Sequence, residues 1–451
     1  MDSTAFFLDI VAAQKGGSAR GVYSVCSAHS AVLEAALVQA GRSGRPALIE
    51  STANQVNQEG GYTGMAPEDF RRAVRALAAA GRFPVDRIIL GGDHLGPYPW
   101  RAQAAEIALR RARELVAASV RAGYAKIHLD ASMPLGGDQV TESGALDARV
   151  AAEREADLAS VAETAWRELR ASDRDASPPV YVIGTEVPPP GGIRAEENAV
   201  PVTPAAELRQ TVALCEESFQ ARNLGDAWRR VIACVAQPGM EFGDQEVHSY
   251  DHAKAGDLCR AARELPGIVV EGHSTDYQTR ASLKALVQDG VAILKVGPAL
   301  TFALRECLFG LEAVERELLA GADPGAEPGI KPGDPPSLSH LQGALEKAML
   351  SDPRHWSGYY TGSEDEKRLA RKYSLSDRCR YYWGVPAVRA AQGALMSNLE
   401  AREIPLPLLS QFLPLQHRRI MEGLCEARPA ALLRESVLIV LEDYAAAVAG
   451  S

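Results

Sequence analysis

Eight short apolar runs recur along the first three hundred residues, and longer stretches with helical periodicity separate them. The runs are rich in Val and Ile, as strands buried on both faces of a sheet should be. Stretches between them, such as EDFRRAVRALAAAG at 68–81, end in glycine, which is a common helix stop. The predicted strands lie within 21–29, 46–52, 87–94, 126–132, 180–187, 230–239, 267–276 and 291–299.

Eight strand–helix units predict an α/β fold of the (β/α)₈ TIM-barrel type, for which about 250 residues is typical. We expect residues 1–310 to form this barrel. Residues 320–337 are rich in Pro and Gly, predict no regular element and say little about function. Helical patterns follow, so residues 311–451 are expected to form a linker and a helical extension packed on the barrel. These patterns lie at 338–351, 364–372, 385–402 and 428–449.

Charge and cysteine content narrow the class of protein. The chain has 48 Lys and Arg against 58 Asp and Glu, a formal charge of −10, which argues against binding nucleic acid. No apolar run is long enough to span a bilayer, and the first twenty residues do not resemble a signal peptide. Seven scattered cysteines without a CxxC pair indicate reduced thiols. A cytoplasmic protein is therefore expected.

Nucleotide-binding fingerprints are missing from the sequence. No GxGxxG opens a helix after the first predicted strand, and no GxxxxGK[ST] occurs. Hydride transfer with bound NAD and P-loop ATP chemistry therefore lack support.

Ionisable side chains gather at the carboxyl ends of the predicted strands, where the active sites of such barrels lie. Burying many of them is costly unless each is paired or holds a metal. Imidazole and carboxylate together suit Zn²⁺, or Mn²⁺, Co²⁺ or Ni²⁺. The residues at the strand ends are Glu50, Asp93, His94, Asp130, Glu186, Gln237, Glu271, His273, Asp276 and Lys295.

His94, Glu186 and His273 are the predicted metal ligands, because strands three, five and seven surround one mouth and three ligands leave room for substrate. The competing interpretation of each histidine is a hydrogen-bonded core residue. His29 and His128 are expected to orient neighbouring groups.

Two lysines on the inner faces of predicted strands are open to two interpretations. Lys126 and Lys295 either pair with Asp130 and Glu271, or one of them is an imine-forming amine with a lowered pKa. The histidine and carboxylate content favours the metal hypothesis over the imine.

Two loops have the composition of binding elements. The first, NQVNQEGGYTG at 54–64, begins with Asn54, and its amides suit a hydroxyl-rich ligand. The second, SLSDRCRYYW at 374–383, contains Arg378 and Arg380, which could bind a phosphate. The alternatives are a glycine-rich surface loop and a solvated turn beside an aromatic cluster.

Several long strings carry a family resemblance: SVCSAHSAVLEAAL, IESTANQVNQEGGYTGM, GGDHLGP, AKIHLDASM, YVIGTEVP, QPGMEF, GHSTDYQT, LKVGPALTFALRE and YSLSDRCRYYW. Through them the chain resembles the D-tagatose-1,6-bisphosphate aldolase Z-subunit family (GatZ/KbaZ-like) from about residue 20 to about residue 420. The resemblance implies a TIM-barrel protein of galactitol, N-acetylgalactosamine or tagatose catabolism. In that family the Z protein is described as a non-catalytic partner of a zinc-dependent aldolase subunit, and some relatives are similar to ketohexose 4-epimerases.

A second, more local likeness concerns Gly92-Asp93-His94, which resembles the Asp-His element of class II aldolases. It implies that His94 is a metal ligand and that Asp93 transfers a proton. Two departures from the family pattern, Tyr98 after GDHLGP and PLGGD after HLDASM, leave the precise substrate open.

The difference between fructose and tagatose restricts the reactions that could interconvert them. Fructose and tagatose differ at C4, and cleaving and rejoining C3–C4 inverts that centre without a redox cofactor. We therefore expect metal-dependent C4 epimerisation of a ketohexose or ketohexose phosphate, with the metal on the C2 carbonyl oxygen and Asp93 and Asp130 as acid–base groups. Expected substrate contacts are Glu50, Asn54, Gln237, Glu271, Asp276, Lys295, Arg378 and Arg380.

The alternative function is a non-catalytic subunit that stabilises a class II tagatose-1,6-bisphosphate aldolase. The expected partners are thus the sugar substrate, an aldolase catalytic subunit or a second copy of this chain, and neither nucleic acid nor a membrane.

Overall fold

The computed structural model describes residues 1–142, 144–184, 200–319 and 337–450. The chain divides into two compact units. The first comprises Met1–Phe242, Val247–Gly297 and Glu442–Ser451, and the second comprises Gly243–Glu246 and Pro298–Leu441. The sequence placed a boundary near residue 310, whereas α10 (Pro298–Leu318) belongs wholly to the second unit.

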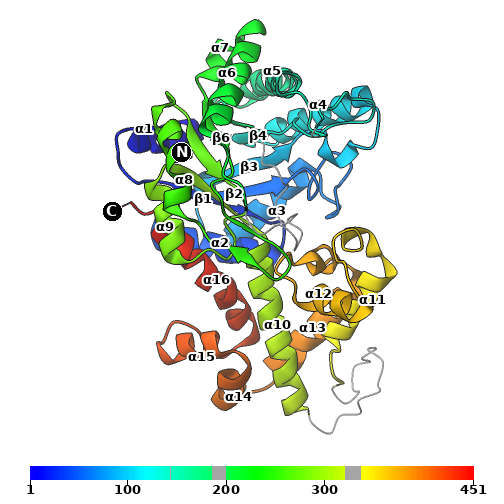
Figure 1. The fold of residues 1–451 in the computed structure, drawn as a ribbon. Coiled ribbons are helices and arrows are strands. Elements are labelled where there is room, and N and C mark those ends of the chain that lie inside the picture. Colours follow the sequence, from blue (N-terminus) through cyan, green and yellow to red (C-terminus); the bar gives the residue numbers. More distant parts are fainter. Residues whose placement is uncertain (143, 185–199, 320–336, 451) are drawn as a thin grey trace. The chain divides into compact units, whose positions relative to one another are not determined.

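The first unit is built on a closed barrel of eight parallel strands (Figure 1). Each predicted strand overlaps one of them, so the predicted TIM barrel is confirmed. Around the barrel the order is β1-β10-β9-β6-β5-β4-β3-β2. The strands are β1 (Val22–Cys26), β2 (Ala47–Thr52), β3 (Ile88–Leu95), β4 (Lys126–Leu129), β5 (Val180–Ile183), β6 (Val231–Val235), β9 (Val269–Gly272) and β10 (Val291–Val296).

Helices connect these strands, as the helical periodicity predicted. They are α2 (Ser30–Ser43), α3 (Pro67–Ala80), α4 (Ala105–Arg121), α5 (Ala148–Ser172), α6 (Ala205–Ala221), α7 (Gly225–Trp228), α8 (His252–Glu264) and α9 (Arg280–Gln288), with the short 3₁₀ turns η1 (Val85–Arg87) and η2 (Tyr98–Trp100). A small antiparallel pair, β7 (Glu241–Phe242) and β8 (Val247–His248), follows β6 and was not predicted.

An N-terminal helix, α1 (Ser3–Lys15), packs at the end of the barrel where the strands begin. Its side chains Phe7, Ile10 and Val11 join one apolar cluster with early strand residues such as Val22 and Leu48. Burying an apolar side chain of this size contributes roughly 1.5–3 kcal/mol. The sequence analysis did not anticipate this helix, which closes the barrel floor.

The last turns of α16 (Pro429–Ala447) belong to the first unit. Glu442 pairs with Arg42 of α2, and Asp443 pairs with Arg280 of α9. The Tyr444 hydroxyl donates to the Thr275 carbonyl at 2.7 Å. This segment therefore lies between α2 and α9, where a barrel places the helix that follows its eighth strand.

The second unit is helical, as predicted. It contains α10, α11 (Leu341–Ser351), α12 (Glu364–Tyr373), α13 (Pro386–Glu400), α14 (Leu406–Phe412), α15 (Pro414–Met421), the first part of α16, and the 3₁₀ turns η3 (Pro353–His355) and η4 (Arg378–Tyr382). Helices α14 and α15 were not predicted. A buried ion pair of 2.6 Å between Arg305 and Asp377 ties α10 to η4. None of the helices in the described ranges has the length and apolar character needed to cross a bilayer.

The packing of α1 against the barrel leads to a prediction about stability. Phe7 is 1% exposed, whereas its neighbour Leu8 is 39% exposed. Phe7→Ala should lower the free energy of unfolding by about 3–5 kcal/mol, because it removes a ring from a packed core. Leu8→Ala on the same helix should cost no more than about 0.5 kcal/mol. Urea denaturation measures both, and similar losses for the two variants would contradict the role assigned to α1.

Candidate active site

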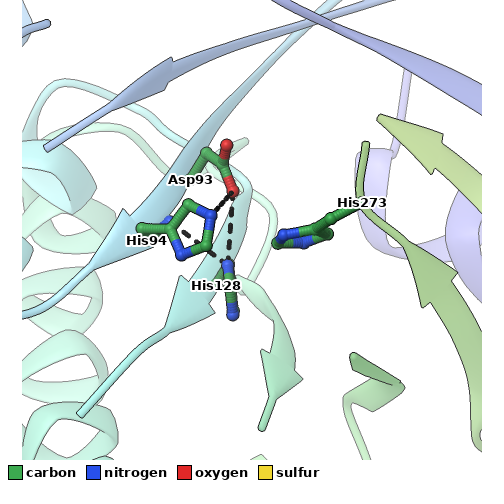
Figure 2. A group of neighbouring side chains, drawn as sticks. All are labelled: Asp93, His94, His128 and His273. Atoms are coloured by element: carbon green, nitrogen blue, oxygen red, sulfur yellow. Dashed lines mark hydrogen bonds and ion pairs between the residues drawn. The ribbon is translucent and has the colours of Figure 1, made fainter. Parts of the chain in front are cut away.

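Three imidazoles and one carboxylate meet inside the mouth of the barrel. Asp93 and His94 come from β3, His128 from β4 and His273 from the residue after β9 (Figure 2). One ligand atom from each lies within 4.8 Å of the others. The ring centroids are 4.8 to 5.2 Å apart. The sequence analysis had assigned direct roles to Asp93, His94 and His273. It had expected His128 to orient neighbouring groups.

Local backbone geometry explains how neighbours Asp93 and His94 reach the same site. Side chains of a regular strand alternate between two faces, so consecutive residues should point apart. His94 adopts a left-handed conformation with φ 49°, and the pairing of β3 with β4 shifts register between Gly92 and Leu95. This irregularity turns both side chains toward the mouth.

Two glycines around this stretch allow close approach. A Cβ atom on Gly91 would lie 2.7 Å from Cγ of Glu50, and one on Gly96 would lie 1.6 Å from the carbonyl oxygen of Asp130. Any side chain there would push β2 or the end of β4 away. The glycines of GGDHLG are therefore packing requirements of the site.

Hydrogen bonds fix two of the imidazoles. His128 Nε2 donates to the Gly184 carbonyl at 2.9 Å, and its Nδ1 accepts from the backbone N–H of His94 at 3.2 Å. The neutral His128 ring thus carries its proton on Nε2. His94 Nδ1 lies 2.8 Å from Oδ2 of Asp130, which leaves His94 Nε2 facing the cluster. A carboxylate behind an imidazole in this way is a common feature of metal sites.

Asp93 Oδ1 is the centre of the cluster. It lies 2.9 Å from Lys295 Nζ, 3.3 Å from His128 Nδ1 and 3.8 Å from His94 Nε2. Burial disfavours the Asp93 carboxylate, but Lys295 and His94 outweigh it and hold its pKa well below the usual range. Since Nδ1 of neutral His128 is an acceptor, its contact with Oδ1 is attractive only when a proton or a cation lies between them.

A second layer of charge lies beneath the cluster. Lys126 Nζ is 2.8 Å from Glu50 and 2.7 Å from Glu271, and all three side chains are fully buried. Lys295 also contacts Glu50. The expected Lys126–Asp130 pair was wrong, because Asp130 is four residues further along the chain and bonds His94 instead.

These contacts disfavour the imine alternative. Burial alone would lower the pKa of Lys295, but Asp93, Cys26 and Glu50 outweigh it and hold that pKa well above its ordinary value. Lys126 has no exposed side-chain surface. An ammonium group enclosed by carboxylates is not the free amine that imine formation requires.

The net charge of this network fits a divalent cation. When the histidines are neutral, as metal ligands are, the carboxylates of this network outnumber its ammonium groups by two. The carboxylates are Glu50, Asp93, Asp130 and Glu271, and the ammonium groups are Lys126 and Lys295. Buried charge without compensation costs several kcal/mol, so a site with two excess negative charges favours a cation.

The pKa values of His273 and His94 shift in opposite directions. His273 Nε2 lies 3.1 Å from Glu271 Oε1, yet burial lowers the pKa of His273 to about 4. For His94, burial also opposes protonation, but Asp93 and Asp130 outweigh it and raise the pKa. At neutral pH, His273 therefore offers a neutral ring, the form that binds metals.

Three further residues of the predicted site lie within the described ranges. Gln237 Oε1 accepts from the backbone N–H groups of Gly239 and Met240, so this side chain shapes its own loop. Asp276 accepts from Gly297 N at 3.0 Å. Asn54 is exposed. Glu186 lies outside the described residues, so its role as a ligand remains a prediction.

Arg378 and Arg380 both lie in the second unit. Arg378 is 6% exposed, stacks over the ring of Tyr359 and donates to the His355 carbonyl. Arg380 donates to the Asp377 carbonyl and to the Tyr381 hydroxyl, each at 3.0 Å. Much of their hydrogen-bonding capacity is thus used locally, and a phosphate-binding role remains a prediction.

Glu155 is a buried carboxyl that the sequence analysis missed. It lies on α5, where its Oε2 faces Gly184 N at 3.5 Å and Cys215 Sγ at 3.2 Å. Burial raises the pKa of Glu155 to about 8. The carbonyl of Gly184 accepts from His128, so Glu155 and His128 contact the same residue. An acidic residue on an otherwise alanine-rich helix face was the available signal.

The fold and this site define a class: a (β/α)₈ barrel with a histidine–carboxylate cluster suited to a divalent metal at the strand ends. The chain also matches a family model, D-tagatose-1,6-bisphosphate aldolase subunit GatZ/KbaZ-like, over residues 7–449. It therefore belongs to the GatZ/KbaZ-like family.

A solved structure matches nearly the whole chain. The crystal structure of a probable tagatose 6 phosphate kinase from Sinorhizobium meliloti 1021 is 43% identical, with a TM-score of 0.83, and the match covers 95% of this chain and 100% of that one. The YdjI aldolase from Escherichia coli K12 is 11% identical over 85% of this chain and 95% of that one, with a TM-score of 0.36. Fructose-bisphosphate aldolase from Campylobacter jejuni is 14% identical over 89% and 93%, with a TM-score of 0.41. The two aldolases are too distant to support a conclusion.

Glu155 generates a prediction about pH. Its pKa in the folded chain is about 8, against an ordinary value of 4.5. Between those values the unfolded chain releases a proton that the folded chain keeps, so this group's contribution to stability falls as pH rises from about 4.5 to about 8. Glu155→Gln should remove a component of a few kcal/mol from that decline.

The control is Glu153→Gln, an exposed position on the same helix. Urea denaturation at several pH values should give parallel curves for the control and the unaltered protein. A Glu155→Gln curve that is also parallel would show that Glu155 ionises normally.

Proposed function

We propose that this protein is a metal-dependent C4 epimerase of a ketohexose or ketohexose phosphate of the fructose/tagatose type, working by retro-aldol cleavage and re-addition. The observation that carries the proposal is the buried cluster of Asp93, His94, His128 and His273 above a lysine–carboxylate network with excess negative charge. Names within the family and among its structural relatives refer to tagatose phosphates, which supports a substrate of this class.

The metal would be held by His94 and His273, with Asp93 or His128 completing the set among the described residues. Glu186, predicted from its position after β5, is a further candidate. Zn²⁺ suits this mixture of nitrogen and oxygen ligands, and Mn²⁺, Co²⁺ and Ni²⁺ are the alternatives. When bound, such a cation supplies Lewis-acid polarisation of the C2 carbonyl oxygen.

Asp93 is the proposed proton carrier. Its depressed pKa keeps it ionised at neutral pH, ready to accept the proton of O4 as C3–C4 breaks and its electron pair passes to C3. The carbonyl group formed at C4 then turns its other face to C3. When the bond forms again, Asp93 returns the proton to O4, so C4 is inverted with no net gain or loss of atoms or electrons.

Lys295 is proposed to position and tune Asp93. Its ammonium lies 2.9 Å from the carboxylate, so it stabilises the ionised form from which proton transfer starts. Asp130 was predicted as a second acid–base group. Its 2.8 Å contact with His94 favours an orienting role, and proton transfer by Asp130 remains the alternative.

Burial distinguishes two groups among the remaining predicted substrate contacts. Glu50 and Glu271 are fully buried between the two lysines, which favours a structural role. Asp276 and Asn54 are the better candidates for sugar hydroxyls, and Arg378 with Arg380 for a phosphate.

The second candidate function is a non-catalytic subunit of a tagatose-1,6-bisphosphate aldolase. The description of the family as an aldolase subunit favours it. Kinase activity, suggested by the name of the Sinorhizobium relative, is less well supported, since the sequence has no P-loop fingerprint.

Incubation with D-fructose and with fructose 6-phosphate, with and without EDTA, tests the proposal. We expect the C4 epimer of at least one substrate to form, and EDTA to abolish its formation until Zn²⁺, Mn²⁺, Co²⁺ or Ni²⁺ is restored. His94→Ala should lower the rate by more than about 100-fold, because it removes a ligand. Chromatography of the sugars measures the product.

The matched control is His252→Ala, which removes a 74% exposed imidazole on α8 and should leave the rate within about twofold. Lack of activity on both ketoses at every metal, combined with stabilisation of an aldolase catalytic subunit, would favour the subunit hypothesis. Activity that resists EDTA and is trapped by borohydride would favour a lysine imine.

Asp130→Asn separates its two possible roles. If Asp130 only orients His94, the variant should bind metal about 10–100-fold more weakly and regain most activity at saturating metal. If Asp130 transfers the proton, activity should stay low at any metal concentration. Activity measured across a metal titration distinguishes the outcomes.

A further inference from the structure

An arginine stands one or two residues before each of the first three strands, in the strings RGV, RPA and RII. They are Arg20 before β1, Arg45 before β2 and Arg87 before β3. The three strands are parallel neighbours in the barrel. The arginines therefore gather at the end where the strands begin, opposite the end that carries the histidine cluster.

These three residues line one cavity of about 350 Å³ in the first unit. Small-molecule sites typically have volumes of about 300–1,000 Å³, so this cavity is large enough for a small ligand. Phe6 and Ile10 of α1 and Pro46 supply an apolar wall. The cavity thus combines cationic groups with a hydrophobic surface.

The positive charge of the cavity lacks local compensation. No carboxylate of the described residues forms an ion pair with Arg20, Arg45 or Arg87. Arg230, which stands before β6 in the same way, has its charge paired with Glu163 at 2.8 Å. Asp86, the neighbour of Arg87 in the chain, is exposed and does not line the cavity. The cavity therefore presents net positive charge on a chain whose formal charge is −10.

Hydrogen bonds to backbone carbonyl groups fix the Arg45 side chain, which keeps its positive charge. Its Nη1 donates to the Val448 carbonyl at 2.8 Å and its Nη2 donates to the Ala449 carbonyl at 2.9 Å. Burial lowers the pKa of Arg45, and the nearby Arg20 lowers it further. An anion between the two groups would relieve that repulsion.

We propose that this cavity binds a small organic phosphate. The planar guanidinium fork matches phosphate oxygens in a bidentate manner. Arg20 and Arg87 supply two such forks to the cavity, and Arg45 adds its positive charge. The apolar wall of Phe6, Ile10 and Pro46 packs against the carbon part of the ligand. This site is independent of the proposed epimerase chemistry, because it shares no residue with the mouth of the barrel.

Calorimetric titration with phenyl phosphate tests the proposal on the full chain. We expect saturable binding, and Arg20→Gln combined with Arg87→Gln should weaken it about tenfold or more. These two side chains make no hydrogen bond among the described contacts, so the double variant should fold with an unchanged Tm. Arg45 is left intact because it anchors the end of α16.

The matched control combines Arg110→Gln and Arg222→Gln, which remove two charges from exposed positions on and after other helices. It should bind phenyl phosphate within about twofold of the unaltered protein. Inorganic phosphate should bind more weakly than phenyl phosphate, since it lacks the apolar part.

Three results would overturn the proposal. One is no binding of phenyl phosphate to the unaltered protein. Another is equal weakening in the control double variant, which would indicate a non-specific charge effect. The third is binding lost in His94→Ala but retained in the Arg20/Arg87 double variant, which would place the ligand in the mouth of the barrel.

Discussion

Burial of charge is the constraint on which the rest of this structure depends. Lys126 lies wholly inside the barrel between Glu50 and Glu271, and Lys295 joins the same carboxylates to Asp93. Taking any one of these groups out of water costs several kcal/mol unless its partners stay in place. The network therefore requires the barrel to close accurately, and its excess negative charge favours a cation near the histidines.

The chain meets this requirement with local departures from regular structure. His94 after Asp93, and Ser274 and Tyr277 after β9, all have positive φ angles. Such conformations cost roughly 1–3 kcal/mol each and persist where surrounding packing imposes them. At His94 the conformation turns the imidazole toward the cluster, which links the strain in the backbone to the chemistry of the mouth.

Much of the fold was predictable because the strands are buried on both faces and so appear as continuous Val- and Ile-rich runs. The polar strand ends were predictable for the same reason, since ionisable residues stand out against such runs. The membership of the cluster was less predictable. Strand alternation alone separates Asp93 from His94, and only the register shift between Gly92 and Leu95 brings them together.

Features that depend on distant contacts were missed. Nothing in the sequence of α1 shows that Phe7 fills the barrel floor. Nothing near Tyr444 shows that the last turns of α16 return between α2 and α9. Glu155 stands on a largely alanine face of α5, which is a sequence signal, but its role depends on Gly184, which is remote in sequence.

The central claim is that the charge network and the three imidazoles hold a divalent cation. Anomalous X-ray scattering, recorded at the absorption edge of the metal found in protein purified without added ions, tests it directly. The account predicts one peak within coordination distance of His94 and His273, and no peak there in His94→Ala. A protein that takes up no metal even after soaking, or a peak elsewhere in the molecule alone, would contradict it.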